Sequence, residues 1–275
     1  MYEELLYEVE DPVATITLNR PERLNALTGR LLSEIKHAIA AAEADERVVG
    51  IILTGAGRGF CAGADMAGLQ ASASGEGREE QTLLESSPGD PSLGPDFQVT
   101  YSYLLGVRKP LIAAINGACA GLGFAIASLC DLRFASTKAV FTSAFVNRGL
   151  IAEHGLSWIL PRLVGPGRAL DILWSGRKFD AAEANQLGLI NRLVEPEDLL
   201  SEARAYITNL AERCSPTSIM IIKQQVYKHL MAPMGEAMTE TNTLMAESLQ
   251  REDFKEGVAS FVERRPPQFQ RISVE

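Results

Sequence analysis

Two glycine-rich segments, each placed between an apolar strand and a helix, constrain this chain of 275 residues more than any other feature. The first covers residues 59–66 and follows the apolar run 48–54, and the second covers residues 116–124 and follows the apolar run 111–115. Small residues at such turns let a ligand approach the main chain, and the N–H groups exposed there suit an anion or a polarised carbonyl. If the two turns converge, the N–H of Leu122 and a second N–H from the first turn would form an oxyanion hole.

The same pattern is also typical of two tight strand-to-helix turns that bind no ligand. A third interpretation is a dinucleotide site at residues 55–59, but this run lacks a complete G-x-G-x-x-G and a following helix. The oxyanion hole and the plain turn without a ligand are therefore the two main interpretations of these segments.

Short strands alternate with helices through the first half of the chain. We expect strands at residues 5–9, 13–18, 48–54, 111–115 and 132–135, and helices at 28–43, 97–105 and 122–129. Thr28 can cap the first helix, Asp65 and Met66 begin a helical turn, and residues 55–63 and 116–123 are expected to be a loop and a tight turn. Residues 71–95 are rich in Gly, Ser, Pro and Glu and predict a mobile surface loop.

From about residue 196 the pattern changes to helices at 199–210, 217–230, 235–249 and 253–262. The predicted fold class is α/β, with a core at residues 1–195. A helical subdomain at residues 196–275 would pack on this core or on a neighbouring subunit and serve oligomerisation.

Composition and charge narrow the class of partner. The chain is 46% hydrophobic and 22% charged, with a net charge of -9 and no long Lys/Arg run, so we expect no nucleic-acid partner. The start lacks the basic and apolar regions of a signal peptide, and the richest apolar stretch is interrupted by Asn and Gly, so we expect no membrane partner. The four cysteines show no metal-ligand spacing, which predicts no metal site, buried thiols and a cytoplasmic location.

Several separate motifs then occur in one order: Arg20-Pro21 with Asn25-Ala26-Leu27, the two glycine-rich turns, Cys130-Asp131, residues 160–165 and the tail 261–269. In order and spacing the chain resembles the crotonase (enoyl-CoA hydratase/isomerase) family over nearly its whole length. The resemblance implies a spiral of ββα units with a helical tail that completes a homotrimer or a dimer of trimers. It implies an acyl-CoA thioester as substrate, so that coenzyme A enters with the substrate and no cofactor is tightly bound.

By the same resemblance, the thioester carbonyl lies between the N–H groups of Ala64 and Leu122, with Gly121 in the second turn. The residues implied for the coenzyme are Arg23, Leu24 and Ala26 along the pantetheine and phosphate path, and Ala62, Asp65 and Met66 around the adenine. Arg264 or Arg265 would reach a phosphate from a neighbouring subunit, or would equally be a solvated charge of the tail. Large aromatic residues, namely Phe97, Tyr101, Phe145 and Trp158, are expected to shape the acyl pocket with the loop 71–95.

The catalytic acids of hydratase-like relatives are missing. Their two positions hold Ala125 and Phe145, and neither side chain can move a proton. Isomerase-like relatives carry a single acid in a Gly-Leu-x-x-(Asp/Glu)-x-Gly segment, and here that position is Glu153. We expect Glu153 to lie among Ile151, Leu156 and Trp158.

One carboxylate suffices for a 1,3-proton shift, so double-bond isomerisation with Glu153 as the single acid/base is the leading hypothesis. The alternatives are hydration with Glu153 and a water, hydrolysis, dehalogenation or carbon–carbon cleavage of a CoA ester, and a non-catalytic acyl-CoA binder. Glu153 could also be an ordinary carboxylate favoured at a helix N-terminus. The acyl group and the pathway are beyond what the residues indicate.

Overall fold

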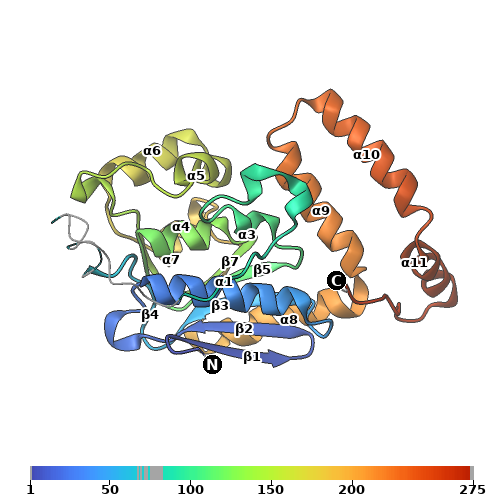
Figure 1. Ribbon diagram of the computed structural model, residues 1–275, viewed down its shortest axis with the longest axis horizontal. Helices are drawn as coiled ribbons and strands as arrows, with labels where there is room; N and C mark the ends of the chain where they lie inside the picture. The colour runs from blue at the N-terminus through green and yellow to red at the C-terminus, as the bar shows by residue number, and fades with distance from the viewer. Residues whose placement is uncertain (1, 67, 69, 71–73, 75–82, 273–275) are drawn as a thin grey trace.

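The computed structural model describes residues 2–66, 68, 70, 74 and 83–272, and its centre is a six-stranded sheet (Figure 1). The strand order is β1-β2-β3-β5-β7-β10. The β1–β2 pair is antiparallel, and every other neighbouring pair in this sheet is parallel. The strands are β1 (Leu5–Glu10), β2 (Val13–Leu18), β3 (Gly50–Gly55), β5 (Leu111–Ile115), β7 (Leu132–Ser136) and β10 (Arg192–Val194).

A second sheet of four short strands has the order β4-β6-β8-β9. These strands are β4 (Gly59–Cys61), β6 (Ala118–Ala120), β8 (Val140–Thr142) and β9 (Phe179–Asp180). Each of β3, β5 and β7 is followed by one of them, and β6 leads into α4 (Leu122–Leu129), which gives the expected spiral of ββα units. The predictions of a plain loop at 55–63 and a tight turn at 116–123 were wrong, because strands of three residues are too short to show a period.

Helix α1 (Gly29–Ala44) begins where predicted. The Thr28 hydroxyl accepts a hydrogen bond from the N–H of Leu31 at 3.0 Å, a cap that stabilises a helix by about 1 kcal/mol. The apolar stripe of α1 covers one face of the large sheet, and α8 (Leu199–Arg213) covers the other. Successive side chains of strand β3 point to opposite faces of the sheet. Ile51 and Leu53 pack in the hydrophobic core on the α1 side, whereas Ile52 packs in the core on the α8 side.

The chain between the sheets and the C-terminal region contains short helices. The expected helix 97–105 was wrong, since Thr100 has a φ of 38° and interrupts it. The observed elements are η2 (Pro91–Leu93), η3 (Pro95–Phe97), α3 (Tyr103–Gly106), η4 (Val146–Arg148), α5 (Leu156–Val164), α6 (Pro166–Ser175), α7 (Ala181–Gln186) and η5 (Pro196–Asp198). Part of the predicted loop 71–95 lies outside the described residues, but its end is fixed, because Pro88 and Gly89 are buried.

The C-terminal helices were predicted to within a few residues. After α8 come α9 (Pro216–His229), α10 (Met234–Ser248) and α11 (Glu252–Glu263). Figure 1 shows α10 and α11 extending away from the sheets, whereas α8 lies against the large sheet. The division at residue 196 into a core and an oligomerisation subdomain stays a prediction.

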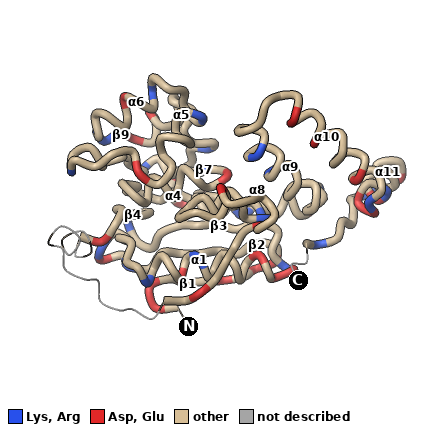
Figure 2. Tube along the Cα trace, turned by 45° about the horizontal axis from the view of Figure 1, so that its top comes forward, with Lys and Arg blue, Asp and Glu red and all other residues tan. Residues whose placement is uncertain are grey.

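Charged side chains are spread along the chain. Figure 2 shows Lys and Arg interspersed with Asp and Glu over the described residues. No helix in the described part of the chain has the length and apolarity to cross a bilayer. Cys61, Cys119 and Cys130 are buried free thiols, as expected, and Cys214 is half-buried.

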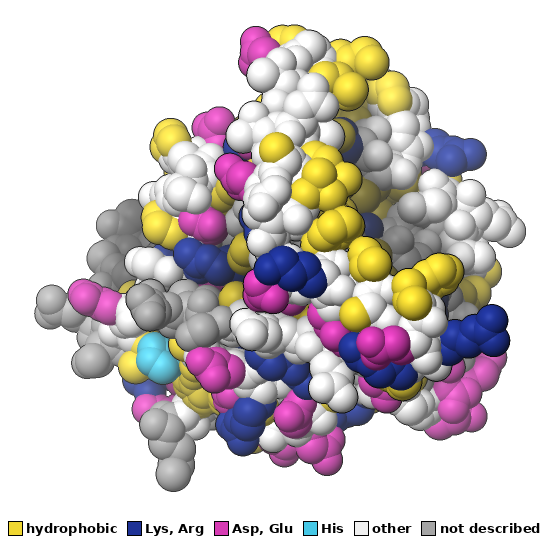
Figure 3. All heavy atoms as spheres, turned by 90° about the vertical axis from the view of Figure 1, so that its right-hand side faces the viewer, with side chains coloured by type: hydrophobic (Ala, Val, Ile, Leu, Met, Phe, Trp, Pro, Cys, Tyr) yellow, Lys and Arg dark blue, Asp and Glu magenta, His cyan; other side chains and the backbone are white. Residues whose placement is uncertain are grey.

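Apolar side chains gather over the C-terminal helices, as the upper part of Figure 3 shows. The exposed large apolar residues of α10, α11 and the turn between them are Met234, Met238, Met245, Leu249, Phe254, Val258, Phe261 and Val262. We call this set the C-terminal apolar face. A patch of this kind marks an interaction surface more often than an ordinary solvent-facing surface.

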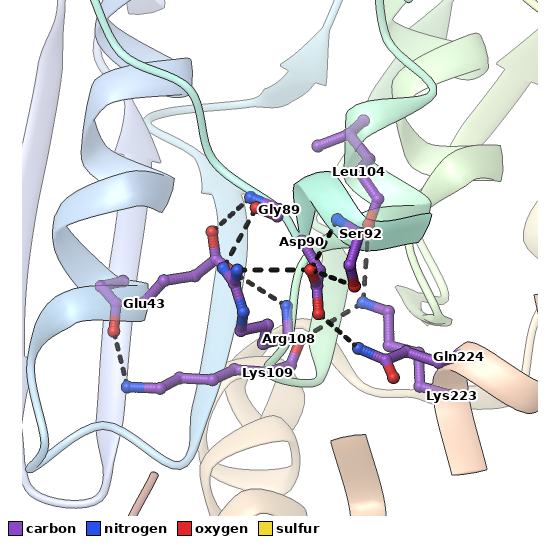
Figure 4. Close-up of polar contacts among 10 residues, drawn as sticks. Glu43, Gly89, Asp90, Ser92, Leu104, Arg108, Lys109, Lys223 and Gln224 are labelled. Carbon is purple, nitrogen blue, oxygen red and sulfur yellow. Dashed lines mark hydrogen bonds and ion pairs between the residues drawn. The ribbon is translucent and has the colours of Figure 1, made fainter. Parts of the chain in front are cut away.

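A buried polar network joins α1, the segment after residue 88, the chain before β5 and helix α9 (Figure 4). The Glu43 carboxylate accepts from the N–H groups of Gly89 (2.6 Å) and Arg108 (2.7 Å). The Lys109 ammonium donates to the carbonyls of Ala42 and Asp45 at the end of α1, and burial lowers its pKa to about 8. These contacts fix the chain that leads to Phe97 and Tyr101, both expected near the acyl pocket.

Candidate active site

A cavity of about 1100 Å³ lies between the two glycine-rich turns and the segment that carries Glu153. The structure brings most of the predicted site residues to its wall: Arg23, Ala26, Ala62, Ala64, Asp65, Met66, Gly121, Leu122, Phe145 and Glu153. Residues as far apart in sequence as Arg23 and Glu153 thus border one space of a size typical for a cofactor-sized ligand.

The first turn leaves one N–H directed away from its pairing partner. The N–H of Leu27 donates to the Gly63 carbonyl (2.8 Å), and the N–H of Asp65 donates to the Leu27 carbonyl (3.0 Å), which forms a single parallel bridge between Leu27 and Ala64. In such a bridge the N–H of the central residue points to the other side. Among the described residues, none accepts a hydrogen bond from the N–H of Ala64.

The second turn places Leu122 as the first residue of the fully buried helix α4. Gly121 has a φ of 51°, which an L side chain rarely adopts. The two turns touch: a Cβ on Gly63 would lie 3.5 Å from the Leu122 nitrogen and 3.0 Å from the Ala120 oxygen. Within the described part of the chain, the Leu122 N–H also has no acceptor, as expected for the first N–H groups of a helix.

Two asparagines that the sequence analysis did not single out as site residues hold the loop between β3 and β4. The fully buried Asn25 amide donates to the carbonyls of Ala56 (3.0 Å) and Gly59 (2.8 Å). The Asn116 amide donates to the carbonyls of Gly55 and Gly57, both at 2.9 Å. In this loop, hydrogen bonds from side-chain amides take the place of main-chain hydrogen bonds between strands. They fix the position at which the first glycine-rich turn begins.

Arg20 was quoted only as part of a motif, yet it lines the cavity and holds together three groups of its wall and border. Its guanidinium contacts the carboxylates of Glu4 (3.2 Å) and Asp65 (2.9 Å) and donates to the Ala26 carbonyl (2.5 Å). The Asp65 carboxylate is therefore held by an arginine and is not a free proton carrier.

Glu153 lines the cavity with about a third of its side chain exposed (33%). The expected burial among three apolar neighbours was wrong in part, because Ile151 is 80% exposed and only Leu156 is fully buried. At the two positions of the hydratase acids, Ala125 and Phe145 are buried and bring no carboxyl to the cavity.

Three predicted site residues lie outside the cavity wall in this single chain. Leu24 has a left-handed backbone (φ 49°), and its carbonyl accepts from the N–H of Ala62 at 2.9 Å. Trp158 packs at the edge of the core under Arg162, whose guanidinium carbon lies 4.0 Å from the ring centroid. Arg264 ends α11, and its neighbour Arg265 is ion-paired with Glu256 and Glu263.

The cavity wall also contains residues for which the sequence suggested no role: Asn147, Arg148 and Lys178. Arg148 is the last residue of η4, the short helix that begins directly after Phe145. Lys178 reaches the wall because β8 and β9 pair antiparallel, and this long-range pairing leaves no local signal.

Comparison with known proteins agrees with this architecture. The family model described as enoyl-CoA hydratase/isomerase matches residues 8–271. A 1,2-epoxyphenylacetyl-CoA isomerase from Escherichia coli is 34% identical over 98% of this chain and 99% of its own length. A crotonyl-CoA hydratase from Syntrophomonas wolfei is 32% identical over 98% of both chains. The crystal structure of an enoyl-CoA hydratase/isomerase from Mycobacterium paratuberculosis is 32% identical and superposes with a TM-score of 0.82 over 98% of this chain and 99% of that chain.

A spiral of ββα units in which two glycine-rich turns meet beside one cavity is the architecture of the crotonase class of enzymes. The chain belongs to the enoyl-CoA hydratase/isomerase family of the crotonase superfamily.

Proposed function

We propose that this enzyme moves the double bond of an acyl-CoA thioester, with Glu153 as its single acid/base and the N–H groups of Ala64 and Leu122 as oxyanion donors. The observation that carries the proposal is the set of carboxylates on the cavity wall. Of the two on the described part of that wall, Asp65 is held by Arg20, whereas Glu153 has no arginine or lysine partner. Relatives of this chain are named both hydratase and isomerase, so the names leave the reaction open.

The proposed reaction needs one carboxylate and no water. The Glu153 carboxylate removes a proton from the α-carbon of a 3-enoyl thioester, and the electron pair moves onto the carbonyl oxygen to form a dienolate. The two main-chain N–H groups stabilise this oxygen as its charge develops. The protonated carboxyl then returns the proton to the γ-carbon, which gives the 2-enoyl thioester and restores Glu153.

Hydration is the second candidate function, supported by the relative named crotonyl-CoA hydratase. It would require Glu153 to activate a water and to deliver the α-proton, because Ala125 and Phe145 supply no second acid. The single carboxylate therefore favours the proton shift over the addition of water.

A second, mainly apolar cavity supports an apolar acyl group. This cavity of about 470 Å³ lies between η4, α5 and α6, and it shares Phe145 and Leu150 with the wall of the larger cavity. Its wall also includes Ala152, next to Glu153, and Ser157, with Leu173 across on α6. An acyl chain that extends past Glu153 would bury its methylene groups there.

We also propose that the chain assembles as a homotrimer or a dimer of trimers through the C-terminal apolar face. Burying these exposed apolar side chains away from water would supply the favourable free energy of association. Arg264 would then approach the coenzyme of a neighbouring subunit.

The test is a turnover assay of wild type and Glu153→Gln with 3-enoyl-CoA and 2-enoyl-CoA, with the products separated by chromatography. Wild type should convert the 3-enoyl ester, and Glu153→Gln should lose roughly two to four orders of magnitude in kcat while still binding the ester. Glu197→Gln, an exposed carboxylate on η5, is the matched control and should keep full activity. Unchanged turnover in Glu153→Gln would contradict the assignment, and hydration of the 2-enoyl ester would favour the second candidate.

A further inference from the structure

We propose that His154 is a positioning residue: its imidazole N–H holds one oxygen of the Glu153 carboxylate and leaves the other oxygen free to carry the proton. This inference rests on the proposed role of Glu153. His154 Nε2 lies 3.3 Å from Glu153 Oε2, a close contact that is not aligned as a hydrogen bond, and both side chains line the larger cavity although they are adjacent in sequence. Catalytic hydrogen bonds are often long or poorly aligned until the substrate binds.

The imidazole is held between two aromatic rings. The Tyr101 ring lies edge-on at a centroid distance of 5.0 Å and an angle of 85°, and the Phe145 ring lies at 6.2 Å and 64°. Tyr101 comes from the segment anchored by the Glu43–Arg108 network, and Phe145 precedes η4. Because the two rings restrict the imidazole, the direction of its Nε2 is set before a substrate binds.

The backbone at His154 is strained in a way that serves this contact. His154 has a φ of 57° and Gly155 a φ of 81°, so two successive left-handed residues lie between Glu153 and α5. The turn closes with a hydrogen bond from the Leu156 N–H to the Glu153 carbonyl at 3.1 Å. Non-glycine residues rarely adopt this backbone conformation, and where they do they cluster at functional sites.

The charge state of the imidazole suits a carboxylate that must both accept and return a proton. Burial lowers the pKa of His154 from its ordinary value of 6.5, and the nearby Glu153 opposes this shift only in part. Tyr101 and Phe145 are in edge contact with the ring, and the other charged residues on the same cavity wall are Arg20, Arg23, Asp65, Arg148 and Lys178. At neutral pH the imidazole is therefore a neutral donor, which orients the carboxylate without forming the ion pair that Arg20 forms with Asp65.

The experiment is a double-mutant cycle with His154→Phe, Glu153→Gln and the double variant. Conversion of 3-hexenoyl-CoA is measured together with exchange of its α-proton in D2O by NMR. Phenylalanine keeps the ring between Tyr101 and Phe145 but removes the N–H, so kcat and the exchange rate should fall about tenfold to a hundredfold with KM nearly unchanged. His154→Gln, which returns an N–H donor at similar reach with the same backbone demand, should recover a large part of the loss.

In the Glu153→Gln background, His154→Phe should cause no further loss, because a residue that acts through Glu153 has nothing left to position. An additive loss, a rise in KM in place of a fall in kcat, or no recovery with His154→Gln would overturn the role of His154. Thermal unfolding of each variant separates these outcomes from a folding defect. If Glu153→Gln itself keeps full turnover, or wild type shows neither conversion nor exchange, the proposed function fails along with this inference.

Discussion

Two of the groups that we propose for the site belong to the main chain and not to any side chain. The N–H of Ala64 is directed away from Leu27 by a single β-bridge, and the N–H of Leu122 opens helix α4. Both donors are fixed by backbone geometry, so exchanging the side chains at these positions should leave them in place. Removing an N–H itself should not be tolerated.

Leu122 allows this difference to be tested. Leu122→Ala keeps the N–H and should retain most of the activity. Leu122→Pro removes it, and since proline is well accepted as the first residue of a helix, α4 should still form. We expect kcat to fall about a hundredfold to a thousandfold in Leu122→Pro, the usual effect of losing one oxyanion donor. Steady-state kinetics on both variants, with circular dichroism as the control for folding, decides the point; equal losses would assign the role to the side chain.

At the same scale, the sequence was informative where a residue belongs to a local motif. Ala64, Leu122 and Glu153 could be named from three such motifs, and all three lie on one cavity wall. The asparagine contacts of the loop at Gly55–Gly59 and the Arg20–Asp65 ion pair join residues 31 to 61 positions apart. Such pairs follow from the tertiary fold, so no periodicity or spacing could indicate them.

Among the elements, the four C-terminal helices and the longer strands were predictable, whereas the strands of three residues and the helices between β8 and β10 were not. Helix α4 and the C-terminal helices carry enough turns for an apolar stripe to show, whereas β4, β6 and β8 have three residues each. The three short strands nevertheless place both glycine-rich turns next to each other. The residues between β8 and β10, for which the pattern predicted no element, fold into α5, α6 and α7 and build the apolar cavity.

Filling the apolar cavity between α5 and α6 should shorten the acyl chain that the enzyme prefers. Ser157 lies on its wall at an exposed position, so Ser157→Trp should be accepted by the fold; Ser201→Trp on α8 is the matched control. With saturated acyl-CoA esters of increasing length, calorimetry on wild type should show affinity rising about fourfold for each methylene that enters the cavity. This rise should disappear in Ser157→Trp. An identical chain-length dependence in wild type and variant would show that the acyl group lies elsewhere.

On the scale of the whole molecule, the single chain leaves the C-terminal apolar face uncovered. Helices α10 and α11 present methionine, leucine, phenylalanine and valine side chains to solvent, and these residues follow one another closely along the two helices. An arrangement of this kind is typical of a subunit surface that is covered in the assembled protein.

Charge introduced on this face should separate the subunits. Wild type should sediment at about three or six times the chain mass of 29.8 kDa, and the double variant Val258→Asp with Phe261→Asp should sediment near the mass of one chain. Buried carboxylates without partners cost several kcal/mol, which is enough to break the contact. Analytical ultracentrifugation gives both masses; a monomeric wild type at micromolar concentration would contradict the proposed assembly.

The position of α8 determines the order in which the fold can be completed during synthesis. The strands of the large sheet lie side by side in the order in which they leave the ribosome, and α1 covers one face as soon as β2 and β3 are paired. The other face, with Ile52, Ile112 and Phe134, stays open until residues 199–207 have been made. A nascent chain therefore exposes this apolar face of the sheet until about three quarters of the 275 residues have been made, and such transiently exposed apolar surface is prone to aggregation.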